Sequence, residues 1–71
     1  MENLSAIAAF IQAADAGSFG AAAKALGIST PAVSKSVKTL EDGFGVRLFH
    51  RTTRGLPLTD EGLAYLERVR P

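Results

Sequence analysis

The middle of the chain carries side chains suited to binding an anionic polymer. Five of them share one face of a helix expected over residues 30–43: Thr30, Pro31, Ser34, Lys35 and Lys38. The two lysines supply positive charge, the two hydroxyls can donate or accept hydrogen bonds, and no acid is expected on this face. Such a face can contact DNA phosphates and base edges, although a run of charges is also typical of an ordinary solvent-exposed surface.

The other reactive side chains do not form a catalytic or metal-binding set. His50 is the only histidine, the chain has no cysteine, and no carboxylate cluster accompanies His50 in the sequence. No combination of nucleophile, base and orienting residue is recognisable. We therefore expect neither an enzyme nor a cofactor, and we expect His50 to be structural or solvent-facing.

The cationic face must be positioned by a preceding helix and a tight turn. Ser18 is expected to cap a helix that ends at Gly27, where glycine permits the left-handed conformation that redirects the chain. Ser29 or the residue after it then caps the next helix, and Pro31 suits a first helical turn. This helix-turn-helix pattern predicts DNA binding, with the helix 30–43 in the major groove and Ser18 near a phosphate.

Apolar residues at helical spacing predict the core. One stripe belongs to the helix 30–43 and contains Val33, Val37, Leu40 and Phe44. A first helix, capped by Asn3 and ending near Ala16, carries a second stripe of Leu4, Ile7, Ile11 and Ala14, with Phe10 at its edge. We expect both stripes to be buried.

A short hairpin with a basic tip follows the helix. Residues 46–49 alternate as in a half-buried strand, and residues 56–58 form a return strand in which proline marks an edge. The connection over residues 50–55 is a predicted wing. Its expected DNA contacts are Arg51 and Thr53 at phosphates and Arg54 in the flanking minor groove.

Two acids stand where the helix 30–43 is expected to end. Glu41 and Asp42 precede Gly43 and lie beside the negative end of the helix dipole, which disfavours acids. This placement indicates another role for them, such as a salt bridge to Arg47 or Arg51.

Composition bounds these interpretations. With 46% hydrophobic and 21% charged residues, the 71-residue chain fits one small globular domain. The net charge of +1 is weak evidence for a nucleic-acid partner, but residues 24–54 hold six of the eight Lys and Arg residues and only two acids. No apolar run approaches the eighteen residues of a membrane span, so we expect no membrane partner.

The detailed pattern resembles a known family. GSFGAAAKALGISTPAVSKSVKTLE followed by GVRLFHRTTRGLPLTDEG is similar to the amino-terminal domain of LysR-type transcriptional regulators. The resemblance implies a mainly α fold: a winged helix-turn-helix with a three-helix core, a two-stranded β wing and the start of a linker helix. It divides the chain into a DNA-binding domain over residues 1–58 and a linker segment over residues 59–71. It also implies a cytoplasmic transcription regulator that binds double-stranded DNA.

The resemblance further implies roles for individual residues. The positions of Thr30, Pro31, Ser34 and Lys35 touch bases or the adjacent backbone in the family. Many members carry glutamine in place of Thr30, arginine in place of Lys35 and a hydroxyl residue in place of Gly20, so base preference and one phosphate contact should differ here.

The last helix, capped by Thr59, admits two interpretations. Its apolar residues are Leu63, Leu66 and Val69. They can cover the first helix, or they can belong to the linker helix through which LysR-type regulators form homodimers or tetramers, which is the interpretation we favour. A small-molecule effector would bind only the carboxy-terminal domain, which is absent from this chain.

Two alternatives remain at this point. The chain can be a winged helix from another regulator family, or a winged-helix module for protein-protein association whose basic face docks an acidic partner. Salt-dependent binding to duplex DNA distinguishes the second alternative.

Overall fold

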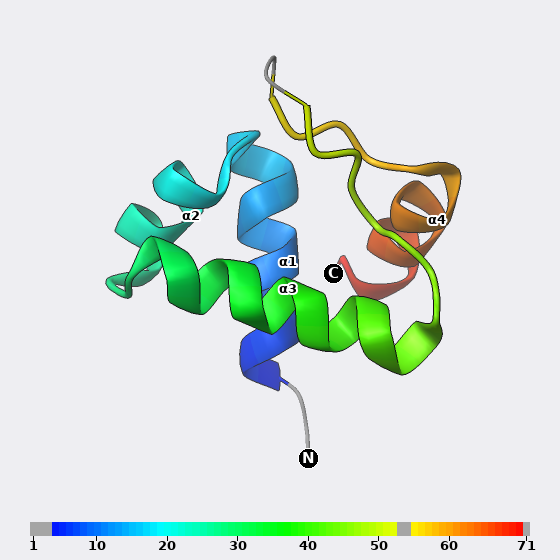
Figure 1. The fold of residues 1–71 in the computed structure, drawn as a ribbon, viewed down its shortest axis with the longest axis horizontal. Coiled ribbons are helices and arrows are strands. Elements are labelled where there is room, and N and C mark those ends of the chain that lie inside the picture. Colours follow the sequence, from blue (N-terminus) through cyan, green and yellow to red (C-terminus); the bar gives the residue numbers. More distant parts are fainter. Residues whose placement is uncertain (1–3, 53–54, 71) are drawn as a thin grey trace.

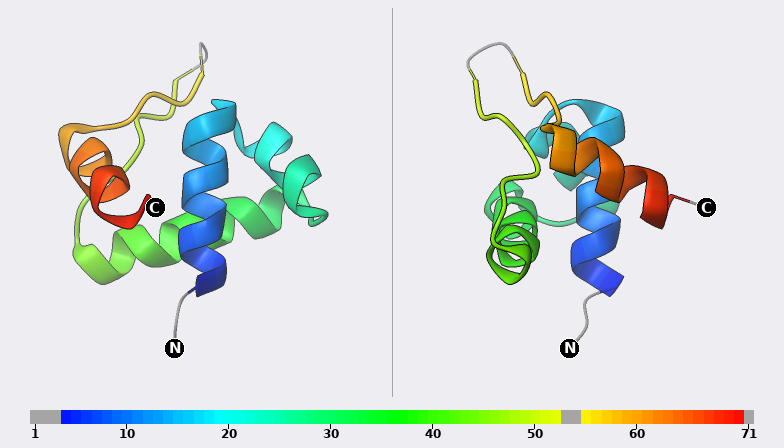
Figure 2. Two further views of the ribbon diagram at one scale, coloured as in Figure 1. Left: turned by 180° about the vertical axis from the view of Figure 1, so that it is seen from behind. Right: turned by 90° about the vertical axis from the view of Figure 1, so that its right-hand side faces the viewer.

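Four helices form the described part of the chain, which covers residues 4–52 and 55–70 of the computed structural model (Figure 1). They are α1 (Leu4–Ala16), α2 (Phe19–Leu26), α3 (Thr30–Phe44) and α4 (Asp60–Val69). The views in Figures 1 and 2 agree that α3 runs across α1, with α2 and α4 on opposite sides of α1. The mainly helical architecture is as predicted. Asn3, the expected first cap, lies outside the described residues.

The turn between α2 and α3 forms as its capping residues predict. Ser18 Oγ accepts a hydrogen bond from the backbone N–H of Ala21 at 3.1 Å, and Gly27 has a φ of 71°. Ser29 Oγ accepts from the N–H of Ala32 at 3.2 Å, so Ser29 is the N-cap of α3. Three residues thus separate the two helices, and local hydrogen bonds cap the end of the first and the start of the second.

Helix α3 ends later than expected. Gly43 lies inside the helix, and Gly45 is the residue in the left-handed conformation, with a φ of 72°. The N–H of Gly45 donates to the carbonyl of Glu41 at 2.8 Å. The helix therefore extends to Phe44, because the chain adopts the left-handed conformation only at the second of the two glycines.

Alanines, not the larger aliphatic residues, form the buried face of α1. The fully buried residues are Ala6, Ala9, Phe10 and Ala13. The predicted stripe is only partly buried, at the border of the core, for Ile7, Ile11 and Ala14. The prediction was therefore wrong: the buried face of the helix is displaced from it by one residue. Small side chains let neighbouring helices approach α1 closely, and this places Phe10 at the centre, 5.3 Å from Phe49 and 5.2 Å from Tyr65 between ring centroids.

The predicted stripe of α3 is buried except at its end. Val33, Val37 and Leu40 have at most 6% of their surface exposed. Phe44 is 51% exposed, contrary to the prediction, because the last turn of α3 extends beyond the core. Its ring packs edge-on against Tyr65 with centroids 4.8 Å apart.

The two-stranded β wing expected from the sequence is not present as strands in the described residues. Two isolated antiparallel bridges pair Phe49 with Leu58 and Thr52 with Gly55. The N–H of His50 donates to the carbonyl of Pro57 at 2.8 Å, but Pro57 has no N–H to return the bond. The segments therefore lie side by side without a continuous ladder (Figure 1). Thr53 and Arg54 lie outside the described residues.

Helix α4 is fixed to the hairpin at its start and to α1 at its end. Thr59 Oγ1 donates to the carbonyl of Arg47 at 2.6 Å and accepts from the N–H of Gly62 at 2.9 Å. At the other end, Arg70 Nη2 lies 2.7 Å from Asp15 Oδ1, and this hydrogen bond raises the pKa of Arg70.

The three apolar residues expected to dimerise occupy different environments. Leu66 is 6% exposed and belongs to the core of this chain, so it is not available as a surface contact. Val69 is partly buried and packs against the core, whereas Leu63 is 50% exposed. The helix thus packs one face against its own domain and leaves Leu63 exposed.

Candidate nucleic-acid interface

The residues of α3 that were predicted to contact DNA lie on its outer face. Thr30, Pro31, Lys35 and Lys38 are exposed, and Ser34 is half-buried. Because the capping bond comes from Ser29, the hydroxyl of Thr30 is not needed to start the helix. The exposed side chains of Thr30 and Lys35 are therefore available to a partner.

One acid does lie on this outer face, contrary to the prediction. Asp42 Oδ1 is 3.5 Å from Lys38 Nζ, one helical turn away, and both side chains are about two-thirds exposed. Because the helix continues past Gly43, Asp42 is still helical and its side chain projects from the same face as that of Lys38. A partner that binds Lys38 must compete with this carboxylate.

The carboxylate of Glu41 joins α3 to the hairpin. Glu41 is 5% exposed, and its Oε2 accepts from the backbone N–H of Leu48 at 2.8 Å and of Phe49 at 3.4 Å. Its Oε1 accepts from Nη2 of Arg51 at 3.1 Å. These contacts satisfy a buried charge, and they engage the N–H groups of Leu48 and Phe49 with a side chain instead of a neighbouring strand, while the carbonyl of Leu48 accepts from the N–H of Thr59 at 3.0 Å. The predicted pairing of the acid with Arg51 is confirmed; the alternative pairing with Arg47 does not occur.

Arg51 is oriented by two partners. Besides the bond to Glu41, its Cζ lies 5.5 Å from the ring centroid of Phe19, at the start of α2. Phe19 in turn packs edge-on against Phe49, with centroids 5.9 Å apart. The guanidinium therefore has a defined position between α2, α3 and the hairpin, and its side chain is still 36% exposed.

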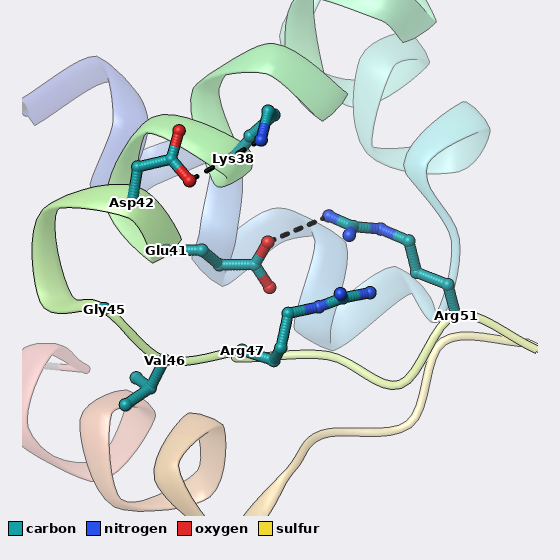
Figure 3. Close-up of a pocket in the computed structure, with 7 residues that line it drawn as sticks. All are labelled: Lys38, Glu41, Asp42, Gly45, Val46, Arg47 and Arg51. Atoms are coloured by element: carbon teal, nitrogen blue, oxygen red, sulfur yellow. Dashed lines mark hydrogen bonds and ion pairs between the residues drawn. The ribbon is translucent and has the colours of Figure 1, made fainter.

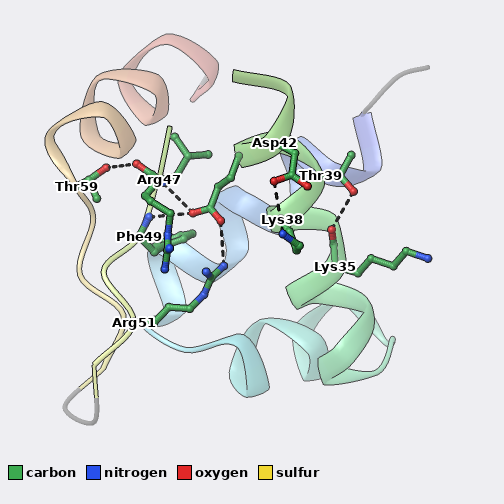
Figure 4. Close-up of polar contacts among 10 residues, drawn as sticks. Lys35, Lys38, Thr39, Asp42, Arg47, Phe49, Arg51 and Thr59 are labelled. Atoms are coloured by element: carbon green, nitrogen blue, oxygen red, sulfur yellow. Dashed lines mark hydrogen bonds and ion pairs between the residues drawn. The ribbon is translucent and has the colours of Figure 1, made fainter. Parts of the chain in front are cut away.

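A groove runs between the second half of α3 and the chain that follows it (Figure 3). Its lining consists of Lys38, Glu41, Asp42, Gly45, Val46, Arg47 and Arg51. Lys38 from the helix and both arginines from the following segment thus lie on one surface. Of the hairpin arginines expected to contact DNA, Arg51 is placed there, whereas Arg54 lies outside the described residues. Lys35 points away from the helix farther along the same surface (Figure 4).

Arg47 is a residue that the sequence analysis did not assign to this surface. It was expected only as a possible partner of the acids. Its exposed side chain instead lies in the groove beside Arg51, as Figures 3 and 4 both show. The alternation expected over residues 46–49 is not observed, because Val46 and Arg47 are both exposed and Leu48 and Phe49 are both buried. The sequence pattern predicted that Arg47 faces outward, but not that it lies beside α3.

The start of α2 is the remaining part of the predicted surface. Ser18 is exposed, and its oxygen already accepts the bond from Ala21, so its hydroxyl hydrogen is free to be donated. Gly20 is exposed and open space surrounds it. The two predicted wing contacts Thr53 and Arg54 cannot be placed, since they lie outside the described residues.

Residues 4–52 and 55–70 contain no group of three or more His, Asp and Glu side chains that could hold a metal ion. His50 is exposed, and the backbone N–H of this residue, not its ring, makes the bond to the hairpin. No helix in the same part of the chain is long and apolar enough to cross a membrane.

Comparison with known proteins yields a consistent set of relatives. Residues 4–63 match the family model of bacterial regulatory helix-turn-helix proteins of the lysR family. The chain is 50% identical over 68 residues to an HTH-type transcriptional repressor of Pseudomonas aeruginosa and 45% identical over 67 residues to the HTH-type transcriptional regulator CrgA of Neisseria meningitidis. These matches cover 96% and 94% of this chain but only 22% of either relative.

Two solved structures have nearly the same fold. A complex of the CbnR DNA-binding domain with DNA superposes with a TM-score of 0.91 at 41% identity, covering 99% of this chain and 79% of the other. A complex of the BenM DNA-binding domain with catB site 1 DNA gives a TM-score of 0.90 at 31% identity, covering 96% and 74%.

Proposed function

The chain belongs to the lysR family of bacterial regulatory helix-turn-helix proteins, and on this premise we propose that it binds double-stranded DNA in a sequence-specific manner as part of a transcription regulator. The observation that carries the proposal is the groove in which Lys38 of α3 lies with Arg47 and Arg51 of the segment after it. Two similar structures that contain DNA support the same function.

Helix α3 lies in the major groove. An α-helix with its side chains is about as wide as that groove, and Thr30, Pro31 and Lys35 are exposed where base edges would lie. A threonine hydroxyl can donate to or accept from several bases, and its methyl group can touch thymine. Lys35 adds a single strong bond to a guanine or a phosphate, without the two-pronged geometry of arginine.

Phosphate contacts fix the position of the helix in the groove. Ser18 supplies a hydroxyl at the positive end of α2, and Arg51 supplies guanidinium donors that Glu41 does not use. These contacts carry no base information, so their loss should weaken binding to all sequences equally.

A paired arrangement completes the proposal. The chain spans about a fifth of the length of the curated relatives that it matches, and we propose that the longer regulator is a homodimer or tetramer. Exposed Leu63 and the partly buried Val69 on α4 are candidates for the contact between copies. Two recognition helices would then lie about 34 Å apart on the duplex, matching a partly palindromic site. We propose that any small-molecule effector binds outside residues 4–63, the part that matches the family model.

Salt titration and selection from a random duplex pool test the function. A chain that neutralises several phosphates should lose affinity with a log-log slope of about −0.9 per phosphate, and the selected duplexes should share a sequence. A protein-association module would show neither a selected sequence nor tighter binding to that sequence than to its scrambled version. That result would contradict the proposal and favour the docking of an acidic protein.

A further inference from the structure

We infer that the groove around Arg47 binds one further backbone phosphate of the duplex, next to the strand segment contacted by α3. The inference rests on the proposed function and adds a contact that the sequence analysis did not assign. It is based on which charged side chains of this groove already have a hydrogen-bond or ion-pair partner within the chain.

Both acids of the groove have partners within the chain. Glu41 accepts from two backbone N–H groups and from Arg51, and Asp42 lies 3.5 Å from Lys38. Arg47 differs from the other two cations, because its guanidinium makes no hydrogen bond or ion pair with another residue of the described chain, and only its backbone carbonyl is bonded, to Thr59. The groove therefore holds three cations and two acids, with its uncompensated positive charge on Arg47.

The position of Arg47 favours an anion with several acceptor oxygens, such as a phosphate. Its guanidinium lies beside that of Arg51 in the views of Figures 3 and 4, and Arg51 is held in place by Glu41 and Phe19. Two neighbouring guanidinium groups repel each other unless an anion lies between them, and phosphate oxygens accept hydrogen bonds from both. The groove is open and adjoins Lys38 on the outer face of α3, so a DNA backbone beside that helix can reach it.

The experiment measures duplex affinity against salt concentration for the wild-type chain and three variants. Arg47→Ala should make the log-log slope less steep by about 0.9, so a fourfold rise in salt weakens the variant about 3.5-fold less than the wild type. Arg47→Lys should restore the slope, since an ammonium can also bind a phosphate. The order of preference among duplexes should not change, because a phosphate contact does not read bases.

Arg68→Ala is the matched control. Arg68 is an exposed cation near the end of α4, outside the groove, and its removal lowers the net charge by the same amount. An unchanged slope for Arg47→Ala, or an equal change for Arg68→Ala, would overturn the phosphate contact while leaving DNA binding intact. A wild-type chain that binds no duplex, or that polyglutamate displaces as effectively as competing duplex does, would overturn the proposed function as well.

Discussion

Glu41 Oε1 lies 3.1 Å from Nη2 of Arg51, and this contact connects the helix proposed to read bases with the hairpin proposed to hold phosphates. The carboxylate is buried, whereas the guanidinium is about one-third exposed. One residue therefore fixes both the path of residues 48–51 and the direction of a cation at the interface. The surface that we propose for DNA therefore depends on a carboxylate that is only 5% exposed.

Replacing the buried carboxylate should destabilise the fold. Glu41→Gln keeps the volume but loses the charge-assisted bonds to Arg51 and to the N–H groups of Leu48 and Phe49, so the free energy of unfolding should fall by about 2 kcal/mol. Glu67→Gln, at an exposed position of α4, should change it by less than about 0.5 kcal/mol. Urea denaturation measures both. Equal effects of the two substitutions would mean that Glu41 does not hold the hairpin.

Gly62 permits the close approach of α4 to the hairpin. A Cβ at this position would collide with the carbonyl oxygen of Leu48, so Gly62→Ala should lower the free energy of unfolding by about 2–3 kcal/mol. Gly43→Ala is the control, because Gly43 is also helical and has open space around it. It should raise stability by about 0.5–1 kcal/mol. We expect thermal denaturation to show a lower melting temperature for Gly62→Ala and a higher one for Gly43→Ala.

Asp42→Asn should strengthen binding to every duplex. The substitution releases Lys38 from its ion pair and removes a negative charge from the outer face of α3. We expect affinity to rise about two- to threefold, as for an exposed pair worth about 0.5 kcal/mol, and the salt dependence to become steeper. Fluorescence anisotropy at several salt concentrations measures this, with Glu67→Gln as the charge-matched control. A gain confined to one sequence would indicate instead that Asp42 reads a base.

Thr30→Gln should change the preferred sequence without changing the salt dependence. A glutamine amide can pair with adenine through two hydrogen bonds, worth about 1–3 kcal/mol of discrimination, and the cap of α3 is retained because Ser29 provides it. Selection from a random duplex pool with both proteins is the measurement. Identical selected sequences would show that Thr30 does not contact bases.

Tyr65→Phe should remove a loss of stability at high pH. Burial raises the pKa of Tyr65 above its ordinary value of about 10. The unfolded chain therefore loses the phenolic proton first, and the stability contributed by the neutral phenol is lost as the pH rises through the pKa of the folded state. The phenylalanine keeps the ring contacts with Phe10 and Phe44. Urea denaturation at pH 8 and pH 11 should show a smaller decrease for the variant than for the wild type.

Local features of this fold were predictable from the sequence because their causes are local. Ser18, Gly27 and Ser29 cap helices through bonds to residues three or four positions away, so their roles follow from residue type and spacing. The outer face of α3 follows from helical periodicity for the same reason. The end of α3 was misplaced, since two glycines stand two residues apart and either can adopt the left-handed conformation.

The sequence by itself determined the helix-turn-helix, the exposed residues of α3 and the family. Only the tertiary structure decided that Glu41 is buried, that Arg47 shares a groove with Lys38 and Arg51, that Leu66 belongs to the core and that the described residues of the hairpin form isolated bridges and no regular strands. Each of these depends on contacts between different segments of the chain, such as the bonds that the N–H groups of Leu48 and Phe49 donate to Glu41. A residue's type states which bonds it can make, but the packing of the helices determines which partners come within reach.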